Sequence, residues 1–191
     1  LADCGQKGSA IVAGEAGVFV GCGTQVWRRE GASDWTAIPG PDERANALLL
    51  DGDRLLAATS GGVWSGSREG LTELVYGPMP VDAAALEPDG ALLVGGGEGL
   101  VRIVDGVATR LGWPVDDVVM ALNVAPDGRI AAGTFSGAWV SDDAGESWLL
   151  ATDWDRFDDA DTAFSYQAGW QRPIEETAKA AGISIEETRR V

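Results

Sequence analysis

SDDAGESW, residues 141–148, follows a short apolar run and fits the pattern Ser-x-Asp-x-Gly-x-Ser/Thr-Trp. The fixed positions are Ser141, Asp143, Gly145, Ser147 and Trp148. In a tight turn a short carboxylate accepts hydrogen bonds from backbone N–H groups, and glycine adopts a positive φ. The tryptophan that begins the next strand can pack its ring between neighbouring sheets. The stretch therefore predicts a β-hairpin whose marked residues are structural.

The segment that precedes this turn recurs along the chain. Four copies align, and they cover Ala10–Phe19, Leu55–Trp64, Leu92–Val101 and Ile130–Trp139. The aligned glycines Gly62, Gly99 and Gly137 are 37 and 38 residues apart. A spacing near 40 residues is typical of one four-stranded propeller blade. The repeat therefore predicts about four such blades.

The strands of each copy are separated by turn signals such as Pro88-Asp89-Gly90 and Pro126-Asp127-Gly128. The second strand of each copy is a short Ala/Val/Leu/Ile-rich run, as expected for a strand covered on both faces. In the copy at Ala10–Phe19, Gly8-Ser9-Ala10 leads directly into this second strand. We therefore expect Ala163–Tyr166, from the other end of the chain, to supply the missing first strand and close the ring.

The 141–148 motif resembles the Asp-box, or BNR repeat, of sialidase-like, sortilin-like and photosystem II assembly factor-like β-propellers. The resemblance extends as a pattern over residues 8–151 and as a motif over nine residues. It implies an all-β fold, a small β-propeller or a propeller-like arc of about four blades. It also implies that the motif lies away from the binding face and that the protein acts through protein contacts.

Two domains are expected: an Asp-box β-propeller-like domain at residues 1–151, and an acidic linker with a helical C-terminal arm at residues 152–191. Pro173 suits a first helical position, and Ser184 with Glu187 forms a capping box, so the arm is expected to be α-helical. Four blades are few for the families that the motif resembles. A closed ring, an arc that leans on a partner and a part of something larger all remain open.

Composition excludes several classes of function. The formal net charge of −16 repels nucleic acid and anionic lipid headgroups. The absence of histidine excludes Ser-His-Asp catalysis and His-ligated metal sites. No apolar run approaches the roughly 18 residues of a transmembrane segment. Sialidase chemistry needs a tyrosine nucleophile and an arginine cluster, and no converging set is visible around Tyr76 or Tyr166. A non-enzymatic protein is expected.

The two cysteines, Cys4 and Cys22, bear on the compartment. A disulfide between them would pin the N-terminus to the strand around Val18-Phe19-Val20 and indicate an oxidising compartment. Two buried free thiols are the alternative. Leu1-Ala2-Asp3-Cys4 also resembles a bacterial lipobox, so lipidation of Cys4 stays open. We expect export to the periplasm or the cell exterior.

Five aspartates follow the repeats, at Asp153, Asp155, Asp158, Asp159 and Asp161. They form a solvated acidic linker or, as the alternative, a calcium site, since calcium prefers carboxylate oxygens on a flexible loop. No other cofactor is expected.

The sequence favours a non-enzymatic, exported β-propeller that is an accessory or stabilising subunit of a larger complex, including a membrane-bound or photosynthetic one. The alternatives are a carbohydrate-binding or degenerate glycosidase-like propeller and a calcium-dependent adhesion module. The aromatic residues that could stack on a sugar are Trp27, Trp64, Trp113, Trp139 and Trp170.

Overall fold

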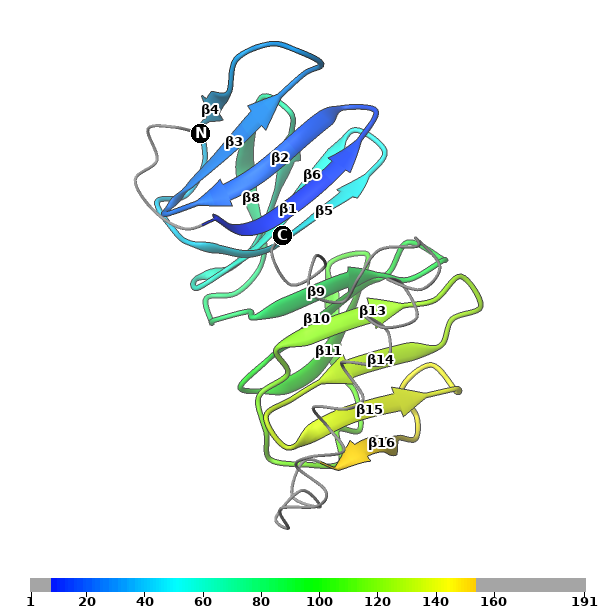
Figure 1. Cartoon of the computed structure of the whole chain (residues 1–191). Helices are drawn as coiled ribbons and strands as arrows, with labels where there is room; N and C mark the ends of the chain where they lie inside the picture. The colour runs from blue at the N-terminus through cyan, green and yellow to red at the C-terminus, as the bar shows by residue number, and fades with distance from the viewer. Residues whose placement is uncertain (1–7, 154–191) are drawn as a thin grey trace, which may run out of the picture. The chain divides into compact units, whose positions relative to one another are not determined.

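The computed structural model describes residues 8–153, and in this part the chain is all-β, with four antiparallel sheets of four strands each (Figure 1). Contacts divide the chain into two units, Leu1–Thr152 and Asp153–Val191, and the account below concerns the first. The prediction of an all-β propeller with four blades is confirmed. The predicted helical arm lies outside the described residues.

Each blade is a run of four consecutive strands. Blade 1 comprises β1 (Gly8–Gly14), β2 (Gly17–Cys22), β3 (Gln25–Arg29) and β4 (Thr36–Ile38). Blade 2 comprises β5 (Ala45–Asp51), β6 (Arg54–Thr59), β7 (Gly62–Ser67) and β8 (Gly70–Tyr76). Blade 3 comprises β9 (Ala83–Leu86), β10 (Leu92–Gly96), β11 (Gly99–Val104) and β12 (Val107–Arg110). Blade 4 comprises β13 (Ala121–Val124), β14 (Ile130–Gly133), β15 (Gly137–Ser141) and β16 (Leu149–Asp153).

The predicted strand order of the first copy was wrong. The apolar run that opens the copy Ala10–Phe19, expected as a second strand, belongs to β1, the first strand of blade 1. Gly17–Cys22 pairs beside it, with Val12 opposite Phe19. Blade 1 is therefore complete with its own four strands, and it needs no strand from Ala163–Tyr166, which lies outside the described residues. The error arose because both runs are short and apolar, so their patterns alone are alike.

Because side chains alternate across a strand, every blade has two faces. We call the side toward the next blade in the sequence the forward face, and the opposite side the back face. Phe19, Leu56 and Leu93 lie at the same position of blades 1, 2 and 3, on the forward face, and are at most 1% exposed. Each packs into a core that the next blade completes from its back face, through Leu55, Leu92 and Ile130 respectively.

Arginine bridges add to two of these joints. Arg28 on β3 donates a hydrogen bond from Nη1 to the carbonyl oxygen of Arg68 in the β7–β8 turn, at 3.0 Å. Arg102, in the equivalent position on β11, donates from Nη2 to the carbonyl oxygen of Ala144 in the β15–β16 turn, at 2.7 Å. Glu87 holds the Arg102 guanidinium through two further hydrogen bonds of 2.5 and 2.7 Å. Charge-assisted bonds of this kind tie one blade's outer turn to its neighbour.

The first strands of the blades contact one another in sequence, β1 with β5, β5 with β9 and β9 with β13. Three apolar cores fill these joints. Within residues 8–153 no such core joins blade 4 to blade 1. Direct packing between these two blades therefore does not close a ring.

The described residues include no helix with the length and apolar character that crossing a bilayer requires.

Removing the core side chain of Leu93 tests the dependence of the fold on the joints between blades. Leu93 is 0% exposed, so Leu93→Ala leaves a cavity and should lower the free energy of unfolding by about 3 kcal/mol in urea denaturation. Leu149→Ala is the matched control, because Leu149 is 71% exposed on β16 and should cost within about 0.5 kcal/mol. Equal losses in the two variants would contradict the assigned core.

Candidate functional site

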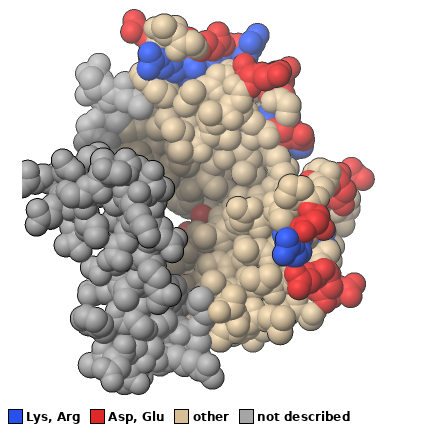
Figure 2. All heavy atoms as spheres, turned by 45° about the vertical axis from the view of Figure 1, so that its right-hand side comes forward, with Lys and Arg blue, Asp and Glu red and all other residues tan. Residues whose placement is uncertain are grey.

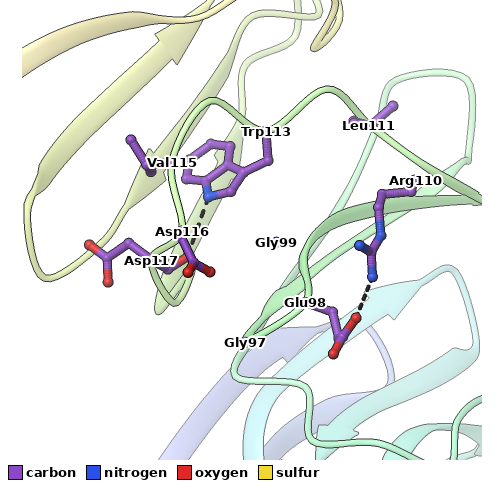
Figure 3. Close-up of a pocket in the computed structure, with 9 residues that line it drawn as sticks. All are labelled: Gly97, Glu98, Gly99, Arg110, Leu111, Trp113, Val115, Asp116 and Asp117. Atoms are coloured by element: carbon purple, nitrogen blue, oxygen red, sulfur yellow. Dashed lines mark hydrogen bonds and ion pairs between the residues drawn. The ribbon is translucent and has the colours of Figure 1, made fainter.

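A pocket of about 340 Å³ lies between blades 3 and 4 (Figure 3). Three segments build it: the β10–β11 hairpin with Glu98, the end of β12 with Arg110 and Leu111, and the connector from blade 3 to blade 4 with Trp113, Asp116 and Asp117. These segments are brought together because the connector must leave the outer strand of one blade and reach the inner strand of the next.

A glycine lets the connector approach the hairpin. Gly99 has a φ of +82°, and a Cβ atom added there would lie 3.2 Å from the Cβ of Trp113. The positive φ and the close contact both favour glycine. The backbone N–H of Leu111 also donates to the carbonyl oxygen of Leu100 at 2.9 Å, which anchors the start of the connector.

Trp113 forms the aromatic wall of the pocket. Its ring packs edge-on against Trp139 at a centroid distance of 6.0 Å and against Trp148 at 4.9 Å. Its indole Nε1–H donates to the carbonyl oxygen of Asp117 at 3.3 Å (Figure 3). Edge-to-face packing and the hydrogen bond hold the ring in one orientation, so this wall is preorganised.

The charged groups of the pocket are mostly acidic. Glu98 and Arg110 point toward one another and form an exposed ion pair (Figure 3). The Asp117 carboxylate accepts hydrogen bonds from the Ser136 hydroxyl at 2.7 Å and from the Ser136 backbone N–H at 2.8 Å. The Ser136 hydroxyl lowers the pKa of Asp117 below its ordinary value, against the opposing effect of burial. Asp117 is therefore ionised at neutral pH, and with exposed Asp116 the carboxylates outnumber the single guanidinium.

This arrangement can receive a cationic group beside an apolar ring. Exposed ion pairs contribute only about 0–1 kcal/mol, so an incoming cation can replace Arg110 beside Glu98 at small cost. Within residues 8–153 no group of three Asp, Glu, His or Cys side chains is placed to hold a metal ion.

The residues of the 141–148 motif form a network at the β15–β16 turn. The Ser141 hydroxyl donates to Asp143 Oδ1 at 2.8 Å and accepts from the Gly145 N–H at 2.7 Å. The Ser147 N–H donates to Asp143 Oδ1 at 2.8 Å, and its hydroxyl to Oδ2 at 2.5 Å. Gly145 has a φ of +86°, and Trp148 packs against the core between blades 3 and 4. The network stabilises the turn.

The polar residues of the motif do not line the pocket, but the motif borders it: Trp148 packs against Trp113, and a Cβ atom added at Gly145 would lie 2.8 Å from Leu111. The motif therefore supports the aromatic wall of the pocket through Trp148, while its polar network stays within the turn. Membership of the Asp-box family itself stays a prediction.

The other candidate residues of the sequence lie elsewhere. Cys22 is 3% exposed on β2, while Cys4 lies outside the described residues, so their predicted disulfide is untested. The calcium candidates Asp155, Asp158, Asp159 and Asp161, and the sugar-binding candidate Trp170, also lie outside the described residues. Asp153 ends β16. The sugar-binding candidates Trp27, Trp64, Trp113 and Trp139 are half-buried, and Trp64 donates its Nε1–H to Glu43 at 3.1 Å.

The acidic residues of the pocket were not singled out from the sequence. Glu98 lies in one hairpin, and Asp116 and Asp117 lie in a connector, so nothing local marks them as neighbours. The Asp-Asp pair directly after Pro114 and Val115, in a segment between two blades, was the one available signal.

No family model matches the chain, and no curated protein matches it. Solved structures do match. The Neurospora crassa Pan2 WD40 domain matches with a TM-score of 0.60 at 15% identity, over 78% of this chain and 50% of that one. Virginiamycin B lyase from Staphylococcus aureus matches with a TM-score of 0.60 at 12% identity, over 75% and 54%. YCF48 bound to D1 peptide matches with a TM-score of 0.56 at 14% identity, over 77% and 54%.

These structures are β-propellers, and at such low identities they show the fold alone. This chain spans about half the length of each of the three. The three include a lyase and a propeller with a bound peptide.

The pKa of Asp143 gives a testable pH dependence. Hydrogen bonds from Ser147 and Ser141 lower this pKa from its ordinary 3.8 to about 2. The ionised carboxylate therefore stabilises the fold above a pH of about 4, and this contribution is lost as the pH falls through about 2. Asp143→Ala should lower the thermal midpoint at neutral pH, and its difference from the native protein should shrink toward pH about 2.

Asp142→Ala is the control, because Asp142 is the exposed neighbour in the same turn. It should change the midpoint little at any pH. A deficit of Asp143→Ala that stays constant from neutral pH to pH about 2 would contradict the role of the ionised carboxylate.

Proposed function

We propose that this protein is a non-enzymatic interaction module that binds a basic segment of a protein partner in the pocket between blades 3 and 4. The observation that carries the proposal is the combination of a fixed tryptophan wall with three carboxylates and a single guanidinium in the lining of one pocket. A lysine or arginine side chain suits this pocket, because its apolar stem can pack on Trp113 and its cationic end can pair with Asp116 or Glu98.

The surroundings of the pocket support a partner with a basic face. The net charge of −16 attracts such a partner over a distance and raises its rate of association. Peptide binding by a similar propeller, as in YCF48 bound to D1 peptide, supports the class of ligand through the fold. We further propose that the chain is an accessory or stabilising subunit of a larger complex, outside the cytoplasm.

Carbohydrate binding and calcium-dependent adhesion are the less supported alternatives. Trp113, the sugar-stacking candidate that lines this pocket, shares it with three carboxylates, and the calcium alternative concerns aspartates that lie mostly outside the described residues. The pocket, in contrast, joins charge and an aromatic surface at one place.

The pocket is tested by selecting peptides from a random display library and measuring the affinity of the selected peptides by fluorescence anisotropy. Enriched peptides should carry lysine or arginine. The double variant Glu98→Gln with Asp116→Asn should weaken binding about tenfold or more, corresponding to about 1.4 kcal/mol, because it removes two carboxylates that contact the cation.

The matched control is Glu73→Gln with Asp53→Asn, which makes the same chemical changes at exposed residues of blade 2. It should bind within about twofold of the native protein. Equal weakening by both double variants would show that bulk charge alone attracts the peptides, and it would refute the proposed site.

The proposed exported location predicts an oxidised Cys4–Cys22 pair. Protein isolated from its native source, denatured without reductant and treated with an alkylating agent should gain no adduct, and the reduced sample should gain two by mass spectrometry. Cys22→Ser should lower the free energy of unfolding by about 2–4 kcal/mol. Two adducts without reductant would contradict the disulfide and the support that it lends to export.

A further inference from the structure

We propose that two copies of this chain form one ring, in which the forward face of blade 4 packs against the back face of blade 1 of the second copy. The inference concerns faces that the pocket does not use, and it stands apart from the proposed function. It rests on three observations: the composition of the two terminal faces, a glycine that makes room for a neighbour, and the size of similar propellers.

The forward face of blade 4 resembles the forward faces that pack against a following blade, but no described blade packs against it. Strand register aligns two rows of residues across β13, β14 and β15, and the residues of both rows point to the same face. One row is Ala121, Gly133 and Ala138, and the other is Asn123, Ala131 and Val140. Ala131 occupies the position of Phe19, Leu56 and Leu93 and is exposed, whereas those three are at most 1% exposed.

Gly133 shows that this face has room for a neighbour. At the equivalent Gly95, an added Cβ would lie 2.6 Å from Val119 at the start of blade 4, and at Gly21 it would lie 3.1 Å from Ala45 of blade 2. Glycine at this position therefore lets the first strand of the next blade approach. Around Gly133 the near contact is Ala121 of its own blade, 3.3 Å away. The space for a following first strand is present and is not filled by a described residue of another blade.

The back face of blade 1 supplies the complementary surface. Ile11, Ala13, Val18, Val20, Trp27 and, at its edge, Arg29 share this face by register. Ile11 is 70% exposed, whereas Val20 is 8% exposed. In blades 2 to 4 the same face is covered by the preceding blade, with Leu55, Leu92 and Ile130 at the position of Val18 and at most 6% exposed. The buried indole Nε1–H of Trp27 has no acceptor within residues 8–153, and neither has that of its counterpart Trp139 in blade 4, so this group does not distinguish an open face from a covered one.

The two terminal faces are complementary in the size of their side chains. The forward face of blade 4 carries alanine and glycine where large side chains would need to enter, and the back face of blade 1 carries isoleucine, valine and tryptophan. The residues at the centre of both faces are uncharged, and Arg29, at the edge of the back face, turns its guanidinium to the carbonyl oxygen of Ser33 and the ring of Trp35. Much of the described surface in Figure 2 is likewise free of charged side chains, which gather in separate patches.

A second copy would cover both the forward face of blade 4 and the back face of blade 1. Each copy offers one forward and one back face, and a two-fold axis joins the forward face of each to the back face of the other, which leaves no open face. The chain corresponds to about half of three larger propellers, so two such arcs supply the blades of one ring of that size. Residues 154–191 of the same chain, or an unrelated protein, are the competing occupants.

Light scattering after size-exclusion chromatography tests the proposal on the full chain at micromolar concentration. The native protein should have twice the chain mass of 19.9 kDa. Ala131→Glu and Ile11→Glu each place a charge in both joints of the ring and should have the mass of one chain. Ala108→Glu is the matched control, because Ala108 is exposed on β12, away from both faces, and should leave the double mass unchanged.

Thermal midpoints measured at low protein concentration separate loss of assembly from loss of fold, because Ala131 and Ile11 are exposed within one chain and both variants should stay folded. A native protein with the mass of one chain would overturn the proposal, and destabilisation of that monomer by Ala131→Glu would point to residues 154–191 as occupant. Double mass in both variants, or an open assembly of more than two chains, would also overturn it.

Discussion

The structure depends on the burial of apolar side chains between consecutive sheets. No blade can cover both of its own faces, since alternate residues of every strand point to opposite sides. Phe19, Leu56 and Leu93 each become solvent-free only when the following blade is in place. Stability is thus a property of joints between neighbours, as in other repeat architectures, and a terminal blade always leaves one face without a neighbour.

The same constraint positions the polar parts of the molecule. Because the joints take the apolar side chains, charged and aromatic groups at the strand ends collect in turns and connectors. At one end of β15 the connector before blade 4 brings Trp113 and Asp117 to the hairpin of Glu98. At the other end, Asp143 closes the β15–β16 turn, and Arg102 of blade 3 reaches the adjacent carbonyl oxygen of Ala144. Rigid turns of this kind are where a propeller can vary its binding surface without changing its core.

Sequence patterns predicted blades 3 and 4 closely. The predicted turns Pro88-Asp89-Gly90 and Pro126-Asp127-Gly128 lie between β9 and β10 and between β13 and β14. Blade 1 was misread by one strand, because Gly8–Gly14 and Gly17–Cys22 are both short apolar runs, and only pairing with β5 distinguishes the inner one. The pocket could not be predicted, because its groups come from a hairpin, a strand end and a connector that are adjacent only after the blades stack.

By itself the sequence determined the local structure: strand and turn chemistry repeat every 37 or 38 residues, and each repeat is short enough to fold as one meander of hydrogen-bonded neighbours. The tertiary structure alone decided which face of each strand is buried and which segments meet. A strand that is apolar on both sides specifies no partner, and the partner is set by packing between distant segments. That packing leaves Ala131 and Ile11 exposed, although their positions in the repeat are those of core residues.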